Sequence, residues 1–488
     1  MKIESDGKAH ALGGSASGAL GWSFLNTAVS RLGTLGIGIA LARLLGPEAF
    51  GTFAVATVAL YAILAFNELG VSLAIVRWPG DPHAIAPTVT TISAVSSSVL
   101  FVASYFAAPT FSAAMGDPNA TPVVRLMCVC ILVNGLVASP AALMQREFMQ
   151  RTRMIVDQVN VWVGAFLSIG LAVAGFGAMS LAIGRVAGAA LSAALFILWA
   201  PGRLRFGLDR SVLPALLRFG LPLAGASIIV FAAGYADQIV AGSVLGPTQL
   251  GFYVLAFNLA SWPVSVFSQP LRSVAPAAFA RLQHDATAMT ETFRSVMGVL
   301  AALTLPLCLL LAGAATPLIE FVYGGQWMPA ADALRWLAVL AAFRIMFELA
   351  YDYLVVRRFT GSLLVVQIVW LAGLIPASII GAKAEGIGGL ALAQVIVAAV
   401  VTAPMYGWFL HRSGLAVHRT VGRLVVPVLA GIIAGAAALA IAASISNAFL
   451  ACVVASVPAL AIVAVALHRD RATLHYLREM RAPEAVSA

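Results

Sequence analysis

The sequence predicts an all-α integral membrane protein with about fourteen transmembrane helices. Three observations support this fold class: the composition, the length of the apolar runs, and the distribution of cationic residues between those runs. Of the 488 residues, 61% are hydrophobic and 10% are charged, whereas soluble proteins carry about 25% charged residues. Apolar side chains in such excess require contact with lipid.

The apolar runs have the length of membrane-spanning helices. A helix needs about 20 mainly apolar residues to cross a hydrocarbon core of roughly 30 Å. The runs are continuous, unlike the short alternating strands of a β-barrel. The polar segment 1–18 lacks the apolar core of a signal peptide, so we expect the first run to be a retained helix. The expected spans are 18–42, 49–73, 84–107, 121–145, 153–175, 177–200, 219–244, 249–271, 293–315, 331–356, 360–382, 386–410, 421–443 and 447–467.

The cationic residues are concentrated in every second loop. If the N-terminus is cytoplasmic, 22 of the 29 Lys and Arg residues lie in cytoplasmic segments, and only Arg43 and Lys383 lie in outside loops. This asymmetry follows the positive-inside rule and predicts that both termini are cytoplasmic. The net charge of +9 is not gathered into one basic patch, so we expect no nucleic-acid partner.

The chain also contains an internal repeat. Leu45-Gly46-Pro47 recurs as Leu245-Gly246-Pro247, and Gly51 and Ala56 recur as Gly251 and Ala256, always at an offset of 200 residues. Each copy lies between the first and second helix of a six-helix block. An even number of helices per period gives both copies the same orientation in the membrane, so we expect two parallel lobes.

The repeat predicts how the chain is divided. We expect an N-terminal lobe over 1–206, a C-terminal lobe over 219–412, and two trailing helices with a cytoplasmic tail over 413–488. Between the lobes, 207–218 combines Leu208, Val212 and Leu216 with charged residues. This amphipathic pattern predicts a linker helix on the cytoplasmic surface.

Enzyme signatures are scarce in this sequence. It contains no Walker A motif, and the longest expected outside loop, 108–122, carries one carboxylate, Asp117. We therefore expect neither nucleotide hydrolysis nor glycosyl transfer, and no cofactor. Cys128 and Cys130 are spaced C-x-C without further ligands, so we expect no metal site.

The candidate functional residues are charges within the spans. A charge near the bilayer centre costs about 2.5–3.5 kcal/mol even on the most lenient scale, so it should face a cavity or a partner. Arg31, Arg185 and Arg344 lie near mid-span in both halves of the repeat. The planar guanidinium can donate two hydrogen bonds at once to the oxygens of a phosphate. These arginines could therefore line one anion-binding cavity.

An alternative is that these arginines pair with acids inside the protein. Glu348 lies one helical turn from Arg344, and Asp352 lies one turn further along the same face. Glu68 could reach toward Arg31, but its depth differs by about 10 Å. Asp237 is a separate candidate, because an acid in the seventh span could bind a cation or a proton, or could cap a broken helix.

Five segments of the chain carry recognisable motifs: 44–51 (LLGPEAFG), 68–77 (ELGVSLAIVR), 145–153 (QREFMQRTR), 274–285 (VAPAAFARLQHD) and 323–338 (YGGQWMPAADALRWLA). No single motif is decisive, but their order and spacing are fairly specific. By these segments the chain resembles the Wzx-type flippases, the polysaccharide transport branch of the multidrug/oligosaccharidyl-lipid/polysaccharide (MOP) exporters.

The resemblance implies two six-helix lobes around a cationic cavity, in a bacterial inner membrane. It implies a substrate, an undecaprenyl-diphosphate oligosaccharide moved to the outer leaflet for a lipopolysaccharide or an exopolysaccharide. Membrane lipids, a polysaccharide polymerase and the chain-length machinery are the expected partners. A lipid II flippase and a cation-coupled drug antiporter remain alternatives, although antiporters favour acids over arginines in the cavity. A scaffold protein would not explain three central arginines.

Overall fold

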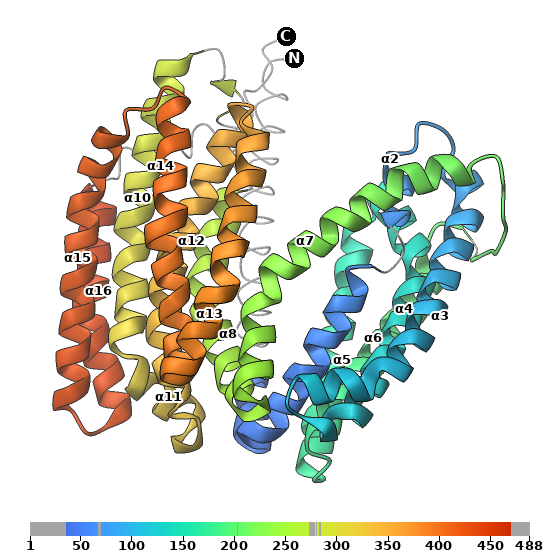
Figure 1. Ribbon diagram of the computed structural model, residues 1–488, viewed down its shortest axis with the longest axis horizontal. Helices are drawn as coiled ribbons and strands as arrows, with labels where there is room; N and C mark the ends of the chain where they lie inside the picture. The colour runs from blue at the N-terminus through green and yellow to red at the C-terminus, as the bar shows by residue number, and fades with distance from the viewer. Residues whose placement is uncertain are drawn as a thin grey trace, which may run out of the picture.

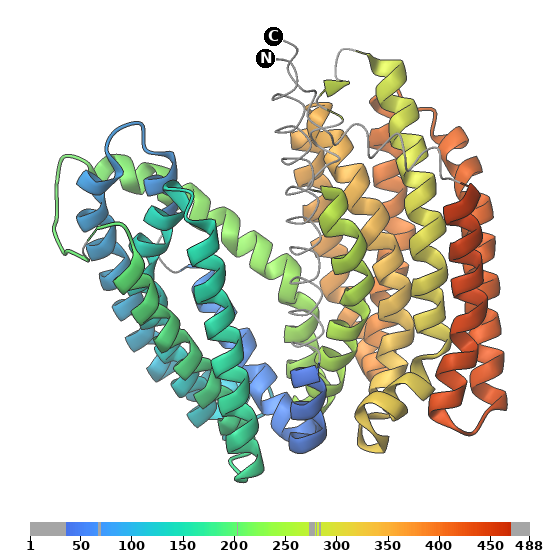
Figure 2. The ribbon, with the colours of Figure 1, turned by 180° about the vertical axis from the view of Figure 1, so that it is seen from behind.

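A computed structural model describes residues 36–66, 70–202, 204–272, 279, 281–282 and 285–469. These residues form helices and no β-strand, which confirms the all-α class. The helices gather into two bundles that approach each other at one end and diverge at the other, so that the outline resembles a V (Figures 1 and 2). We call the two ends of the V the closed end and the open end.

The N-terminal lobe contains the helical run Gly36–Leu64 and five labelled helices. These are α2 (Ser72–Arg77), α3 (Pro82–Ala114), α4 (Thr121–Arg146), α5 (Gln150–Val173) and α6 (Ala178–Trp199). A 3-10 turn, Pro118–Ala120, precedes α4. The short α2 was not expected, since a single span had been predicted over 49–73.

The C-terminal lobe is the larger bundle. It contains α8 (Pro247–Arg272), α10 (Ala286–Gly313), α11 (Ala315–Tyr323), α12 (Ala330–Val356), α13 (Thr360–Val397) and α14 (Ala403–Arg412). A 3-10 turn, Gly325–Trp327, follows α11, and a π-helical turn, Ala398–Thr402, joins α13 to α14. The trailing helices α15 (Val417–Ser444) and α16 (Ala448–Arg469) pack against α10.

Helix α7 (Leu213–Leu245) connects the lobes and packs against both. Its first turns lie on α2 and α3, where Leu216 is fully buried beside Val71 and Ile75. Its second half packs against α8 and α13. The helix bends as it crosses from the N-terminal lobe to the centre of the molecule (Figure 1). Thus α7 belongs structurally to both bundles.

The surface helix predicted over 207–218 is not present as a separate element. The backbone N–H groups of Gly207 and Asp209 donate to the hydroxyls of Thr91 and Thr88 on α3, each at 3.0 Å. The backbone is therefore bonded to α3 rather than to itself. Hydrogen bonds from Ser211 lower the pKa of the Asp209 carboxyl. The helical part of this segment is the beginning of α7.

Two pairs of expected spans appear as continuous helical runs that contain a break. In Gly36–Leu64, Gly46 has a φ of +74° and is followed by Pro47, which cannot donate to the preceding turn. In α13, Glu385 and Gly386 leave helical geometry, and Gly386 has a φ of +60°. Each break lies where a loop between two spans was predicted. Residues 18–35 of the first expected span lie outside the described residues.

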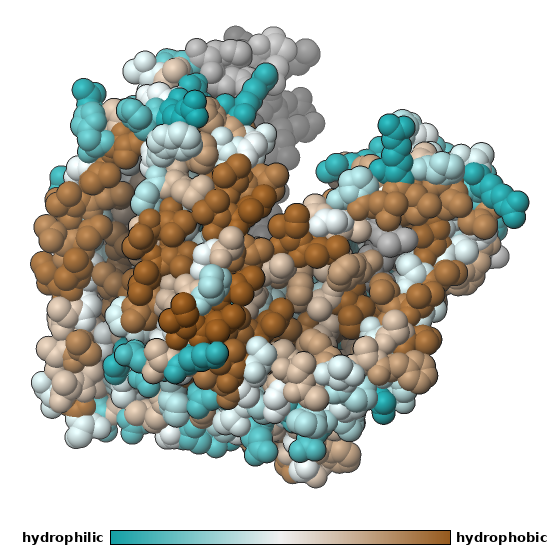
Figure 3. Space-filling view, viewed as in Figure 1, coloured by the Kyte–Doolittle hydropathy of each residue, from teal (hydrophilic) through white to brown (hydrophobic). Residues whose placement is uncertain are grey.

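Among the described residues, ten helices are long and apolar enough to cross a membrane. The two broken runs each cover more than one expected span. Helix α12 is 27 residues long and carries five charged side chains, so it does not have the composition of a simple lipid-facing span. Many of its side chains are nevertheless buried in the C-terminal lobe. Figure 3 shows an apolar band between two ends at which hydrophilic residues gather.

Small residues allow close packing within the lobes. A Cβ on Gly184 of α6 would lie 2.4 Å from the carbonyl oxygen of Gly164 on α5, and one on Gly313 of α10 would lie 2.3 Å from the carbonyl oxygen of Gly435 on α15. In lipid, helix association depends on such close backbone approach, because burying apolar side chains there gains little. These glycines therefore hold α5 to α6 and α10 to α15.

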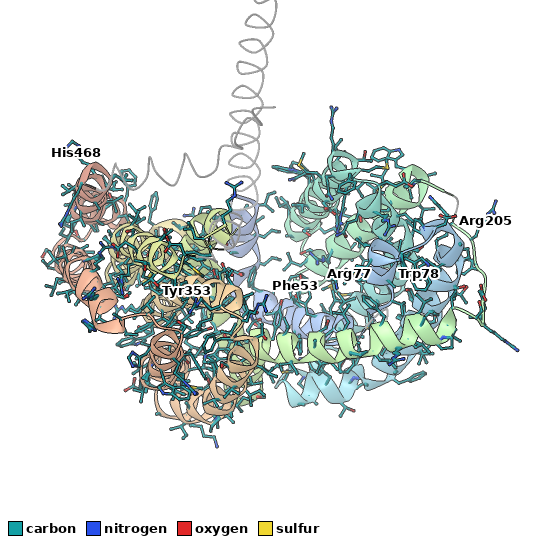
Figure 4. All side chains as sticks on the ribbon, turned by 90° about the horizontal axis from the view of Figure 1, so that it is seen from above. Phe53, Arg77, Trp78, Arg205, Tyr353 and His468 are labelled. Carbon is teal, nitrogen blue, oxygen red and sulfur yellow. The ribbon has the colours of Figure 1, made fainter. Side chains whose placement is uncertain are left out.

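The largest buried cluster joins the lobes at the closed end. It includes Ala54 and Val58 of the N-terminal lobe together with Leu250, Trp327 and Leu334 of the C-terminal lobe. The space-filling view shows a hollow between the lobes at the open end (Figure 3). We call this hollow the central cleft. In the view from the open end, Phe53 lies between the two lobes (Figure 4).

Candidate functional site

Helix α7 presents two polar side chains to opposite lobes. Tyr235 and Asp237 are two residues apart, which turns them by about 200° around the helix axis. The ring of Tyr235 stacks on Tyr61 of the N-terminal lobe, with centroids 5.4 Å apart. The carboxylate of Asp237 accepts a hydrogen bond from the hydroxyl of Tyr253 in the C-terminal lobe, at 2.6 Å. The boundary between the lobes therefore passes through α7 at this level.

On the N-terminal side, Arg185 of α6 lies beside Tyr61. One guanidinium nitrogen, Nη2, donates to the Tyr61 hydroxyl at 3.3 Å. Arg185 is also close enough to interact electrostatically with Cys130 of α4 and with Tyr235. Its side chain is exposed although three helices surround it. This arrangement fits an arginine that faces the central cleft.

On the C-terminal side, Asp237 lies in a buried hydrogen-bonded group. Its side chain is 5% exposed. One carboxylate oxygen accepts from Tyr253, and the other accepts from the backbone N–H of Gln238 at 2.8 Å. Gln394 of α13 donates through Nε2 to the Tyr253 hydroxyl at 2.5 Å. The chain Gln394–Tyr253–Asp237 links α13, α8 and α7, and it supplies the hydrogen bonds that a buried carboxylate requires.

Arg344 of α12 lies on the same side as Asp237. Its guanidinium carbon is 5.6 Å from the ring centroid of Phe257 on α8, a cation–π distance. It also interacts electrostatically with Asp237. Among the described residues, no ion pair joins Arg344 to Glu348. Arg344 therefore makes no ion pair with its one-turn neighbour, and Asp237, from another helix, lies close enough to interact with it electrostatically.

Glu348 and Asp352 lie in a different environment. Both interact electrostatically with Tyr406 of α14, and Phe347 stacks on the same ring with centroids 5.0 Å apart. Asp352 is buried, and Glu348 is partly exposed. Since α12 runs from the closed to the open end, these acids lie nearer the open end than Arg344 does.

The structure thus brings three of the predicted site residues to one level of the molecule. Arg185 and Arg344 lie on opposite sides of α7, near residues 235–237, and Asp237 lies between them. Arg31 and Glu68 lie outside the described residues. The remaining two acids, Glu348 and Asp352, are displaced toward the open end.

The closed end is sealed by contacts between distant parts of the chain. Trp327 is 0% exposed, and its ring packs edge-on against Phe50 and Phe252 at 5.6 and 5.8 Å. Its indole N–H donates to the carbonyl of Ala42 at 3.0 Å. The guanidinium of Arg43 donates to two adjacent carbonyls at the end of α11, at 2.5 and 2.8 Å. A substrate in the cleft has no path through this end in the present conformation.

Sequence reasoning missed several residues of this site. Tyr253 bonds Asp237 from 16 positions away, and Gln394 bonds Tyr253 from 141 positions away, each from another helix. Tyr61 and Tyr235 appeared as ordinary apolar residues of their spans. These contacts depend on which helices pack against each other, and the spacing of residues within one helix does not predict that packing. The signal available was a polar-tipped aromatic ring inside a span, since a buried tyrosine hydroxyl requires a partner.

This architecture, two helical lobes with a cleft that is open at one end, defines an all-α, multi-span membrane protein. A family model described as "Polysaccharide biosynthesis protein" matches residues 40–332. That match covers more than half of the chain, and the chain belongs to this family.

Named relatives agree with this assignment. The chain is 28% identical over 338 residues to the succinoglycan biosynthesis transport protein ExoT of Rhizobium meliloti (strain 1021), an alignment that covers 66% of this chain and 65% of that protein. It is 23% identical over 394 residues to the lipopolysaccharide biosynthesis protein WzxC of Escherichia coli (strain K12), covering 79% of each chain.

Solved structures share the fold. The lipid II flippase MurJ in an inward closed conformation superposes with a TM-score of 0.73 at 14% identity, covering 94% of this chain and 100% of MurJ. An inward-facing multidrug transporter of the MATE family gives 0.61 at 17% identity, covering 80% and 99%. The chain is therefore a multi-span membrane protein with the MOP transporter fold, as the sequence predicted.

Proposed function

We propose that this protein is a flippase that moves an undecaprenyl-diphosphate-linked oligosaccharide from the inner to the outer leaflet of a bacterial inner membrane. The transported unit enters the synthesis of a surface polysaccharide. The open end faces the cytoplasm, as the distribution of cationic residues predicts, and both termini lie on that side. The protein makes or breaks no covalent bond of its substrate, and a polymerase and the chain-length machinery act on the product.

One observation carries this proposal: Arg185 bonds Tyr61, whose ring stacks on Tyr235 of α7, while Arg344 lies over Phe257 of α8, the helix whose Tyr253 bonds Asp237 of α7. A diphosphate cannot enter a low-dielectric cleft unless cations compensate its charge. Two dispersed arginines can bind phosphate oxygens through their forked N–H groups without holding them in one tight site. In this proposal Arg31 is the third cation of the cleft.

The named relatives support the substrate class. ExoT and WzxC are called succinoglycan transport and lipopolysaccharide biosynthesis proteins, and both polymers are assembled from sugars. MurJ, which shares the fold, is a lipid II flippase. Lipid II also carries a sugar on a prenyl diphosphate, so it remains the alternative substrate. The cleft arginines favour either anionic lipid over the substrates of a drug antiporter.

Transport by the purified full chain in proteoliposomes tests this function. Arg185→Ala and Arg344→Ala should each abolish flipping of a polyprenyl-diphosphate oligosaccharide while the protein still folds, and Lys in place of either should retain part of the activity because only the fork is lost. Arg335→Ala is the matched control. This arginine lies on α12 too, but it is exposed and donates to Thr316 at 2.8 Å.

Different results would overturn the proposal in different ways. Normal flipping by an Arg185→Ala, Arg344→Ala double variant would rule out the cationic cleft. Transport of lipid II in preference to other oligosaccharide lipids would assign the alternative function. If the arginines are structural partners of the acids, the single variants should be unfolded, and removing Asp237 as well should restore folded protein.

A further inference from the structure

Three aromatic rings form a continuous strip along the boundary between the lobes. Tyr61 stacks on Tyr235 with centroids 5.4 Å apart and planes inclined by 28°. Tyr235 stacks on Phe231 of the same helix at 5.1 Å and 19°. All three rings are partly exposed, whereas Trp327 and Tyr253 of the core are fully buried. The strip therefore lies at the edge of the core, against which Phe231 and Tyr235 pack, and part of each residue stays accessible.

Arg185 stands at one end of this strip. Its hydrogen bond to the Tyr61 hydroxyl uses one of the five N–H donors of the guanidinium, so others remain for an incoming anion. The bond also fixes the guanidinium against the ring. As a result, a phosphate bound by Arg185 would lie close to the aromatic strip.

On the opposite side of α7, the aromatic rings nearest Arg344 already have partners. Arg344 already lies over the ring of Phe257, and the neighbouring ring, Tyr253, is buried and bonded to Asp237 and Gln394. The two arginines thus have different neighbours. The rings beside Arg185 are those of Tyr61, Tyr235 and Phe231, and each of them is partly exposed.

We propose that Tyr61, Tyr235 and Phe231 form the subsite for the first sugars of the substrate, next to the phosphate held by Arg185. This inference rests on the proposed function and adds a specificity determinant to it. The first sugar is bonded directly to the diphosphate, so it must lie beside any group that holds that phosphate. A pyranose presents C–H groups along one face, and these pack against the electron-rich face of an aromatic ring.

The strip also has a direction. Helix α7 runs from the open end to the closed end, so Phe231 lies one turn nearer the open end than Tyr235 does. The sugar next to the diphosphate is then placed at Tyr61 and Tyr235, and the following sugar reaches Phe231. Specificity for the first and second sugars should consequently depend on different rings.

Binding measurements with three probes test this subsite. The probes are a short polyprenyl diphosphate without sugar, one with a single sugar and one with a disaccharide, each titrated against the purified full chain. Tyr61→Leu should weaken binding of both sugar-bearing probes by about three- to tenfold more than it weakens binding of the bare diphosphate, since the bare probe senses only the lost hydrogen bond to Arg185. Phe231→Leu should weaken the disaccharide probe more than the monosaccharide probe. Arg185→Ala should weaken binding of all three probes.

Controls separate a sugar contact from a structural role. Phe166→Leu removes a ring from another stacked pair, with Trp162 on α5 at 5.8 Å and 26°, and it should change no affinity. Tyr61→Phe keeps the ring and should keep the preference for the sugar-bearing probes. If Tyr61→Leu does not fold, Phe231→Leu decides the question, since its side chain makes no hydrogen bond.

Two results would overturn the inference while the proposed function stands. Equal losses for the bare and sugar-bearing probes would mean that the rings only position Arg185. Unchanged affinities in Tyr61→Leu and Phe231→Leu would mean that the rings contact no sugar. A wild-type protein that binds none of the three probes would overturn the proposed function itself, and the subsite with it.

Discussion

Gly51 and Gly251, which occupy equivalent positions in the two repeats, pack reciprocally at the closed end. A Cβ on Gly51 would lie 2.0 Å from the carbonyl oxygen of Pro247, and a Cβ on Gly251 would lie 2.5 Å from the carbonyl oxygen of Pro47. Each glycine thus faces the Leu-Gly-Pro turn of the other repeat. Both turns also use a glycine with positive φ, +74° at Gly46 and +85° at Gly246.

We expect alanine at either position to open the closed end. The added methyl group would force two backbones apart, a steric conflict that costs about 1–3 kcal/mol. Gly51→Ala and Gly251→Ala should each lower the thermal stability of the purified protein. Because the two glycines belong to the same contact between backbones, the double variant should lose less stability than the sum of the losses of the single variants.

Gly298 of α10 supplies the control for these variants. It has open space where a Cβ would be, and alanine is the better helix former, so Gly298→Ala should not lower stability. Additive losses of stability at positions 51 and 251 would show that the two glycines belong to independent contacts.

A second prediction concerns Trp327. Replacement by Phe keeps an aromatic ring but removes the N–H that donates to the Ala42 carbonyl, which should destabilise the closed end by about 1 kcal/mol. A cysteine introduced at Phe53, in an otherwise cysteine-free protein, should then become more reactive toward an impermeant thiol reagent added outside. Trp336→Phe is the control, because that tryptophan is 37% exposed. Unaltered labelling in Trp327→Phe would show that the indole hydrogen bond does not keep the closed end shut.

Asp237 is predicted to couple transport to an ion gradient. Asp237→Asn keeps the size of the side chain and can still accept the Tyr253 hydroxyl hydrogen bond, but it cannot carry a charge. Transport by this variant in proteoliposomes should lose its dependence on an imposed proton or sodium gradient. If both the rate and the gradient dependence match those of the wild type, Asp237 has no coupling role and serves to join α7 to α8.

The orientation in the membrane is a separate prediction. Single cysteines at positions 205 and 285 should react only with reagents that reach the cytoplasm, whereas cysteines at 115 and 325 should react from outside. The loops at 205 and 115 lie at opposite ends of the N-terminal lobe, and alternate loops lie at the same end (Figure 1). Labelling of position 285 from outside would contradict the fourteen-helix arrangement.

The long-range order of the fold could be predicted from local features. Apolar runs gave the helices, because a span must satisfy its own backbone in lipid. The Leu-Gly-Pro turns gave the repeat, since a glycine with positive φ before a proline ends one helix and begins the next. Of the charges, Arg185, Arg344 and Asp237 were singled out because an ionisable group inside a span needs compensation, and their role in transport stays a prediction.

Other features could not be predicted because they depend on contacts between distant segments. The apolar pattern of 207–218 fits a surface helix, yet two of its backbone N–H groups donate to threonine hydroxyls of α3 instead. Glu348 is the nearest acid to Arg344 in sequence, but no ion pair joins the two among the described residues, and Asp237 of α7 lies within electrostatic range of Arg344. The short helix α2 also went unpredicted, since the expected span was extended past Leu64 to residue 73.

The shared position of α7 has a consequence for assembly during synthesis. Leu216 is 0% exposed and completes a cluster with Val71, Ile75 and Ile85 of the N-terminal lobe. A nascent chain that has released only its first 206 residues therefore lacks part of that lobe's core. The N-terminal lobe matures only after the beginning of the second half has been inserted, so two fragments separated at the linker should recombine poorly unless α7 is synthesised with the first.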